Sequence, residues 1–71
     1  MDKYQLGTNI NFVILEDYVV VLDFKTGEFY LLTKEYIHIF NLLKNNKEIK
    51  SSPELVSSIN NLLECNILEE V

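Results

Sequence analysis

The chain has 71 residues, enough for one small domain over positions 1–71, and a domain of that size buries only about 60% of the surface that its unfolded chain exposes. Its apolar runs are far shorter than the roughly 20 residues of a membrane span, and Asp2, Lys3 and Gln5 interrupt the start, where a signal peptide would be apolar. Eleven acidic residues face six lysines and no arginine, and the resulting net charge of −5 disfavours nucleic acid as a partner.

Three β-rich segments come first in the chain. A tight turn at Glu16-Asp17 joins the first two, and Lys25-Thr26-Gly27 forms a three-residue loop before the third. Gly27 can take the left-handed position of a type I turn with a G1 bulge. Short connections make consecutive strands antiparallel neighbours, so we expect a meander. The expected strands are Asn11 to Glu16, Tyr18 to Phe24 and Glu28 to Leu32.

The three-residue loop also predicts the register of the last two strands. Phe24 would face Glu28, and Leu22 would face Tyr30. One side of the sheet would then carry Val20, Leu22, Phe24, Tyr30 and Leu32, and the other Val19, Val21, Asp23, Phe29 and Leu31. The second side is more apolar than a solvated face should be. We therefore expect Val19, Val21, Phe29 and Leu31 to contact a partner enzyme or a second copy of the chain in a weak homodimer.

Two helices are predicted after the strands. Thr33 is a suitable N-cap, and an apolar face built by Tyr36, Ile37, Ile39, Phe40, Leu42 and Leu43 continues to about Lys44. The polar stretch from Asn45 to Ser51 indicates a loop or at most one helical turn. Ser52 and Pro53 then begin a helix whose apolar stripe is Leu55, Val56, Ile59, Leu62 and Leu63. Asn66 is a candidate left-handed C-cap, after which Ile67 and Leu68 return to the core.

Catalytic groups are sparse in this sequence. Cys65 is the one cysteine, and its apolar surroundings favour a small core residue in a reducing, cytoplasmic compartment. His38 is expected to be a partly exposed helix residue, Asp23 a turn residue, and Glu69-Glu70 a solvated acidic end. We therefore expect no enzyme activity, no metal site and no cofactor.

The most informative feature is the third strand, because no later strand is predicted to cover its outer edge. The unpaired N–H and C=O groups of such an edge can bind an extended peptide by β-augmentation. A groove between this strand and the last helix would be lined by Tyr30 and Leu32 on one side and by Leu55, Ile59, Leu62 and Leu63 on the other.

The run from Val20 to Thr33 reads VVLDFKTGEFYLLT and resembles the signature of PqqD-like proteins, the recognition elements for precursors of ribosomally synthesised, post-translationally modified peptides. The similar pattern continues through Tyr36, Ile39-Phe40 and Leu42-Leu43, and ends in an echo of the family's closing motif at Leu62 or Leu63, Asn66, Ile67 and Leu68. The resemblance covers about residues 11 to 70 and is a pattern of residue classes.

The resemblance implies a winged-helix-like α+β fold: a three-stranded antiparallel meander followed by two to three helices packed on one face. The polar segment from Asn45 to Ser51 is too short for the family's middle helix, which we expect to be short or missing. The implied function is binding of a leader peptide along the third strand and delivery to a separate maturation enzyme. The implied leader-binding residues are Glu28, Phe29, Tyr30, Leu31, Leu32, Leu55, Ile59, Leu62 and Leu63.

Several partners and functions remain open at the level of sequence. A free-standing protein of this size is most similar to the leader-binding proteins of lasso-peptide pathways, which serve a separate protease, and next to partners of radical-SAM peptide-modifying enzymes. A small winged-helix DNA-binding regulator is an alternative from another class, although the acidic last helix disfavours it. An inhibitor-like acidic domain and a small enzyme have no motif in their favour.

Overall fold

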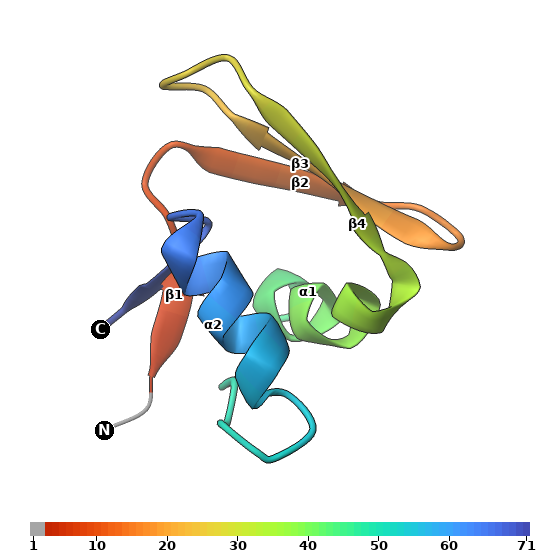
Figure 1. The fold of residues 1–71 in the computed structure, drawn as a ribbon, viewed down its shortest axis with the longest axis vertical. Helices are drawn as coiled ribbons and strands as arrows, with labels where there is room; N and C mark the ends of the chain where they lie inside the picture. Colours follow the sequence, from red (N-terminus) through yellow and green to blue (C-terminus); the bar gives the residue numbers. More distant parts are fainter. Residues whose placement is uncertain (1–2) are drawn as a thin grey trace.

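The structure, a computed structural model, describes residues 3–71 and has the predicted α+β architecture (Figure 1). Three antiparallel strands form a sheet in the order β2-β3-β4, and the two helices lie together on one side of it. The elements in chain order are β1 Tyr4–Leu6, β2 Ile10–Ile14, β3 Tyr18–Asp23, β4 Phe29–Thr33, the 3-10 helix η1 Lys34–Tyr36, α1 Ile37–Lys44, α2 Val56–Glu64 and β5 Leu68–Glu70.

A second, two-stranded sheet was not predicted. β1 and β5 pair antiparallel, with Gln5 opposite Glu69, so the two ends of the chain run side by side (Figure 1). Their connection to the rest of the fold is tight at Gly7, whose backbone N–H donates to the carbonyl of Ile67 at 2.8 Å. This small sheet closes the domain on the side away from β4.

The register between β3 and β4 differs from the prediction by one residue. Val21 pairs with Tyr30, and Leu22 pairs with Phe29. The cause is a loop of four residues, 24–27, in place of three: the Asp23 N–H donates to the Glu28 carbonyl at 2.9 Å, which closes the hairpin outside the loop. Gly27 does take the predicted left-handed conformation, with φ of 77°.

The side chain of Asp23 stabilises this longer loop. Its Oδ1 accepts hydrogen bonds from the backbone N–H groups of Lys25 at 2.9 Å and Thr26 at 3.3 Å. Thr26 Oγ1 in turn accepts from the N–H of Glu28 at 3.2 Å. These side-chain contacts satisfy three amides of the turn, an arrangement typical of Asp and Thr in loops. Asp23 is therefore a turn residue, as predicted.

The new register changes which residues share a face. Val19 and Val21 are completely buried, opposite Leu32 and Tyr30. The prediction that these two valines form a partner-binding face with Phe29 and Leu31 is therefore wrong. A one-residue slip sends alternate side chains of one strand to the opposite side of the sheet. Phe29 and Leu31 remain exposed, but their neighbours across β3 are Leu22 and Val20.

Both helices end in the same way. α1 stops at Lys44 as predicted, and Asn46 follows with a left-handed φ of 55°. At the end of α2, Asn66 has a φ of 61°, and its N–H and that of Ile67 donate to the carbonyls of Leu63 and Leu62. This pair of hydrogen bonds is the Schellman motif, which satisfies carbonyls at a helix end. The left-handed C-cap predicted at Asn66 is thus confirmed.

The helix starts are less regular than the sequence indicates. Thr33 does precede the first helical turn, but its hydroxyl donates to Glu35 Oε1 at 2.6 Å, and η1 forms before α1 begins. α2 begins at Val56, after a turn in which the carbonyl of Ser52 accepts from the N–H groups of Leu55 and Val56. Residues 45–55 contain no helix, in agreement with the expectation of a short or missing middle helix.

One core fills the space between the sheet and the helices. Phe12 and Phe40 meet edge to face inside it, with ring centroids 4.9 Å apart. Ile49 is fully buried and anchors the otherwise polar segment between the helices. The buried hydrophobic residues are Ile10, Val19, Val21, Ile39, Phe40, Ile49, Ile59, Leu62, Ile67 and Leu68.

Candidate functional site: the β4 edge

Several kinds of site find little support in the part of the chain that the structure describes. Residues 3–71 contain no helix that is both long and apolar enough to cross a membrane. They also contain no group of three or more His, Cys, Asp or Glu side chains that could hold a metal ion. His38 is exposed on α1, as expected, whereas Cys65, predicted to be a core residue, is exposed as well.

β4 is an edge strand, because its one neighbour among residues 3–71 is β3. In an antiparallel pair, hydrogen-bonded and non-hydrogen-bonded residue pairs alternate. The bond from Asp23 to Glu28 begins this alternation, so the backbone groups of Tyr30 and Leu32 face β3. The N–H and C=O groups of Phe29, Leu31 and Thr33 therefore point away from the sheet, where an added strand could pair with them.

The other edge of the sheet is partly closed by the chain itself. On β2, the N–H of Phe12 donates to the side chain of Asn11 at 2.8 Å. The N–H of Ile10 donates to the carbonyl of Gly7 at 3.2 Å. These local bonds occupy two of the donors that a peptide strand would need. Of the two edges, β4 is the better surface for strand addition.

Apolar side chains flank the β4 edge on both sides of the sheet. Phe29 is 71% exposed and Leu31 is 66% exposed, and both point away from the helices. Tyr30 and Leu32 point toward the helices and are half-buried against the core. A peptide added beside β4 would place its own alternate side chains next to each of these pairs.

One hydrogen bond joins α2 to the residues that follow β4. Asn61 Nδ2 donates to the hydroxyl of Tyr36 at 3.1 Å, just beyond the end of β4. Near the start of β4, desolvation raises the pKa of the Tyr30 hydroxyl, and the nearby Glu28, Cys65 and Asp23 raise it further. Asn61 on α2 therefore lies beside η1, and Cys65, which follows α2, is near enough to Tyr30 to influence its hydroxyl.

The helix face turned toward β4 is not the predicted one. Ile59 and Leu62 are each 1% exposed and belong to the core, so the prediction that they line a groove is wrong. Leu55 and Leu63 are half-buried and pack against the core. Asn61 and Cys65, which sequence reasoning missed, are the exposed residues on the β4 side. Their i, i+4 spacing could have indicated a shared face, but polar residues at that spacing are ordinary on a helix surface.

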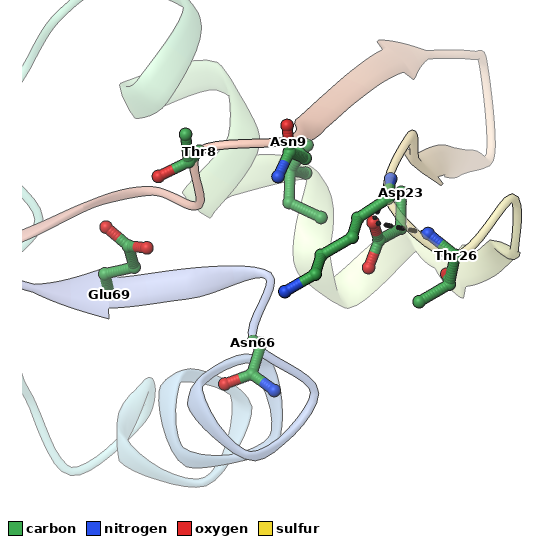
Figure 2. Close-up of a pocket in the computed structure, with 8 residues that line it drawn as sticks. Thr8, Asn9, Asp23, Thr26, Asn66 and Glu69 are labelled. Carbon is green, nitrogen blue, oxygen red and sulfur yellow. Dashed lines mark hydrogen bonds between the residues drawn. The ribbon is translucent and has the colours of Figure 1, made fainter.

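One surface hollow lies near the hairpin and is polar. It has a volume of about 380 Å³ and lies between the β1–β2 loop, the β3–β4 loop and the end of α2 (Figure 2). Asp23 is part of its wall, but the carboxylate is already bonded to the amides of its own turn (Figure 2). The lining residues are Thr8, Asn9, Ile10, Asp23, Lys25, Thr26, Asn66 and Glu69.

A second hollow, also of about 380 Å³, lies beside β1 and the closed edge of β2. Its lining residues are Tyr4, Gln5, Leu6, Phe12, Leu43, Asn46 and Lys47. Neither hollow includes a residue of β4. The β4 edge offers exposed backbone groups, which suit an extended peptide better than a small molecule.

No protein-family model matches this chain, and neither a curated protein nor a solved structure matches it. The assignment of a function therefore rests on the geometry of β4 and its neighbours and on the residue pattern of the hairpin.

Proposed function

We propose that this domain binds the leader segment of a ribosomally synthesised precursor peptide as an extra strand along β4, in the cytoplasm. It then delivers the bound precursor to a separate maturation enzyme. The main support for this proposal is that the backbone N–H and C=O groups of Phe29, Leu31 and Thr33 point outward from an edge strand. The PqqD-like residue pattern from Val20 to Thr33 supports the identity of the peptide.

The leader would run antiparallel to β4, and every second residue of it would bond to the strand. Its side chains would alternate between Phe29 and Leu31 on one side and Tyr30 and Leu32 on the other. Of the nine residues that the resemblance implies, the five from Glu28 to Leu32 are kept in this proposal. On α2, Asn61 and Cys65 replace the buried Ile59 and Leu62 as the helical wall.

A winged-helix-like outline fits this proposal, with the meander as the wing and the non-helical segment 45–55 in place of a middle helix. The same outline could suggest a DNA-binding regulator. α2 argues against that role, because its sequence contains no lysine or arginine and ends in Glu64. Phosphate contacts require basic side chains.

The maturation enzyme is proposed to be a leader protease of a lasso-peptide pathway, because the chain resembles the leader-binding proteins that serve such proteases. A radical-SAM peptide-modifying enzyme is the alternative. Assaying the precursor with each enzyme, with and without this domain, distinguishes them. The domain should accelerate one reaction and leave the other unchanged.

Calorimetric titration tests leader binding directly. The probe is the synthetic leader half of the precursor encoded beside the gene, and the core half is the control. Leu31→Pro removes an outward N–H and Leu31→Ala keeps it, so comparison of the two variants isolates that donor. We expect Leu31→Pro to bind about fivefold to tenfold more weakly than Leu31→Ala, as one lost hydrogen bond predicts.

Two results would overturn the proposal. One is equal binding of the leader and core halves. The other is equal affinity of Leu31→Pro and Leu31→Ala while both retain the native far-UV circular dichroism spectrum, because strand addition requires the N–H.

A further inference from the structure

The side of the β2-β3-β4 sheet that faces away from the helices is uncovered by any element of residues 3–71 (Figure 1). We call it the outer face. The observed register assigns to it Asn11, Val13, Leu15, Tyr18, Val20, Leu22, Phe29, Leu31 and Thr33, and Phe24 follows in the adjoining loop. Not one of these residues is charged. An antiparallel sheet with one side in water normally alternates apolar and polar residues, and this sheet does not.

The outer face holds most of the exposed apolar surface of the described chain. Eight large hydrophobic residues are exposed, and Val56 and Val71 are the two that lie elsewhere. The other six are Val13, Leu15, Tyr18, Phe24, Phe29 and Leu31. Contiguous patches of this kind mark interaction surfaces in monomeric proteins.

We propose that a second copy of this chain covers the outer face, so that two three-stranded sheets pack into a sandwich. The six exposed side chains present on the order of 600 Å², if a large side chain offers about 150–250 Å² in full. Two copies would then bury about 1,200 Å², the lower limit of a specific interface. The area is therefore sufficient for a weak dimer that forms and dissociates with concentration.

Self-association is compatible with the charge of the molecule because the face itself is neutral. Each copy carries a net charge of −5, but a pair of outer faces brings no like charges into direct contact. Much of the acidic charge lies on elements beyond the helical side of the sheet, in the segment before α2, at the end of α2 and in β5. These residues are Glu48, Glu54, Glu64, Glu69 and Glu70.

We place the twofold axis of this dimer between the two sheets, where it crosses the strands near their middle. The Glu16-Asp17 turn and the Lys25 loop lie at opposite ends of β3. Such an axis would set the acidic turn of one copy near Lys25 of the second copy, twice in the dimer. Aligned sheets pack about 10 Å apart in this arrangement.

The sandwich would cover the side chains of Phe29 and Leu31 but leave the outward N–H and C=O groups of β4 free, and it does not depend on the proposed leader function. A dimer of this kind would bind two leaders, one at each exposed edge. Its test uses no peptide, and its failure would leave the leader proposal unaffected.

Sedimentation velocity over about 5 µM to 1 mM protein measures the dimer directly, a range that brackets weak association. Val13→Lys places a charge on the outer face on β2, away from β4, and Val56→Lys makes the same change on an exposed position of α2. We expect Val13→Lys to raise the dimer dissociation constant at least tenfold, because a buried lysine without a partner is costly. Val56→Lys should leave the dissociation constant unchanged.

Wild-type protein that stays monomeric up to about 1 mM would overturn the proposal. The outer face would then be a binding surface for a different protein. Equal weakening by both lysine variants would also overturn it, because the effect would then not depend on the outer face. A charge exchange offers a second check. Lys25→Glu should weaken the dimer, and adding Asp17→Lys to it should restore the affinity; no effect of either change would contradict the twofold axis.

Discussion

Val21 and Tyr30 lie directly opposite one another across the β3–β4 pair, with Val21 completely buried and Tyr30 half-buried beside the candidate peptide strip. This pairing joins the core of the domain to its edge. A slip of one residue would put Val21 and Tyr30 on opposite faces of the sheet, so that one of them would leave the helical side. The position of the candidate site therefore depends on a stable hairpin register.

Val21→Ala should lower the free energy of unfolding by about 2–3 kcal/mol, since it removes methyl groups from a fully buried position. Leu31→Ala, on the same sheet but 66% exposed, should change it by less than about 0.5 kcal/mol. Urea unfolding of both variants measures these values. Similar losses for the two would contradict the assignment of Val21 to the core and Leu31 to the surface.

Gly7→Ala should destabilise the domain more than Gly27→Ala. A Cβ at Gly7 would lie 2.7 Å from the backbone oxygen of Asn66, so the β1–β5 side of the fold would have to shift, at a cost of about 1–3 kcal/mol. Gly27 has open space around it, and its φ of 77° alone sets a cost of about 1 kcal/mol. Thermal unfolding of the two variants gives the order, and the reverse order would contradict the close approach at Gly7.

Stability should fall at high pH through Tyr30. The pKa of its hydroxyl is raised above 10.0 in the folded protein, chiefly by desolvation. The unfolded chain therefore loses this proton first, and the contribution present below pH 10 is lost as pH rises through the folded pKa. Urea unfolding at about pH 9 and about pH 11 should show a smaller loss in Tyr30→Phe than in the wild type. Equal losses in the two proteins would contradict a contribution from Tyr30.

The leader half of the precursor should protect Cys65 from alkylation. Cys65 is exposed, and it is near enough to Tyr30 of β4 to help raise the pKa of that hydroxyl, so the proposed strand would approach it. Mass spectrometry of maleimide labelling measures the rate with and without peptide. A matched control combines Cys65→Ser with Val56→Cys, which moves the thiol to an exposed position elsewhere on α2. Equal protection of the two thiols, or protection by the core half, would contradict the assignment of the helical wall.

Local signals in the sequence predicted much of the fold. The meander, the end of α1, the left-handed Gly27 and the C-cap at Asn66 each depend on residues close together in the chain. Turn and cap residues act through their own backbone, so the sequence around them is informative. The same reasoning correctly indicated that the segment after α1 has no helix of its own.

The register could not be predicted because both sides of the β3–β4 hairpin are apolar. Val19 through Leu22 are consecutive aliphatic residues, so a slip of one residue exchanges one apolar side chain for another. Asp23 determines the register, because its carboxylate accepts hydrogen bonds from two backbone amides and so stabilises a four-residue loop. A hydrophobic pattern fixes a register only where the two faces differ.

Two further features had no local signal. β1 and β5 are three residues each, and they pair Gln5 with Glu69 across nearly the whole chain. The helical wall of the candidate site was misplaced because the apolar stripe of α2 was expected to serve both the core and a groove. In a domain this small, Ile59 and Leu62 are buried in the core and are not available to line a groove.

Amide hydrogen exchange at β4, measured by NMR with and without the leader half, tests the central claim most directly. In the free protein, the N–H groups of Phe29, Leu31 and Thr33 should exchange rapidly, while those of Tyr30 and Leu32 are protected by β3. Bound leader should slow exchange at Phe29, Leu31 and Thr33, and the core half should have no effect. Leader binding that leaves these three amides in rapid exchange would contradict strand addition along β4.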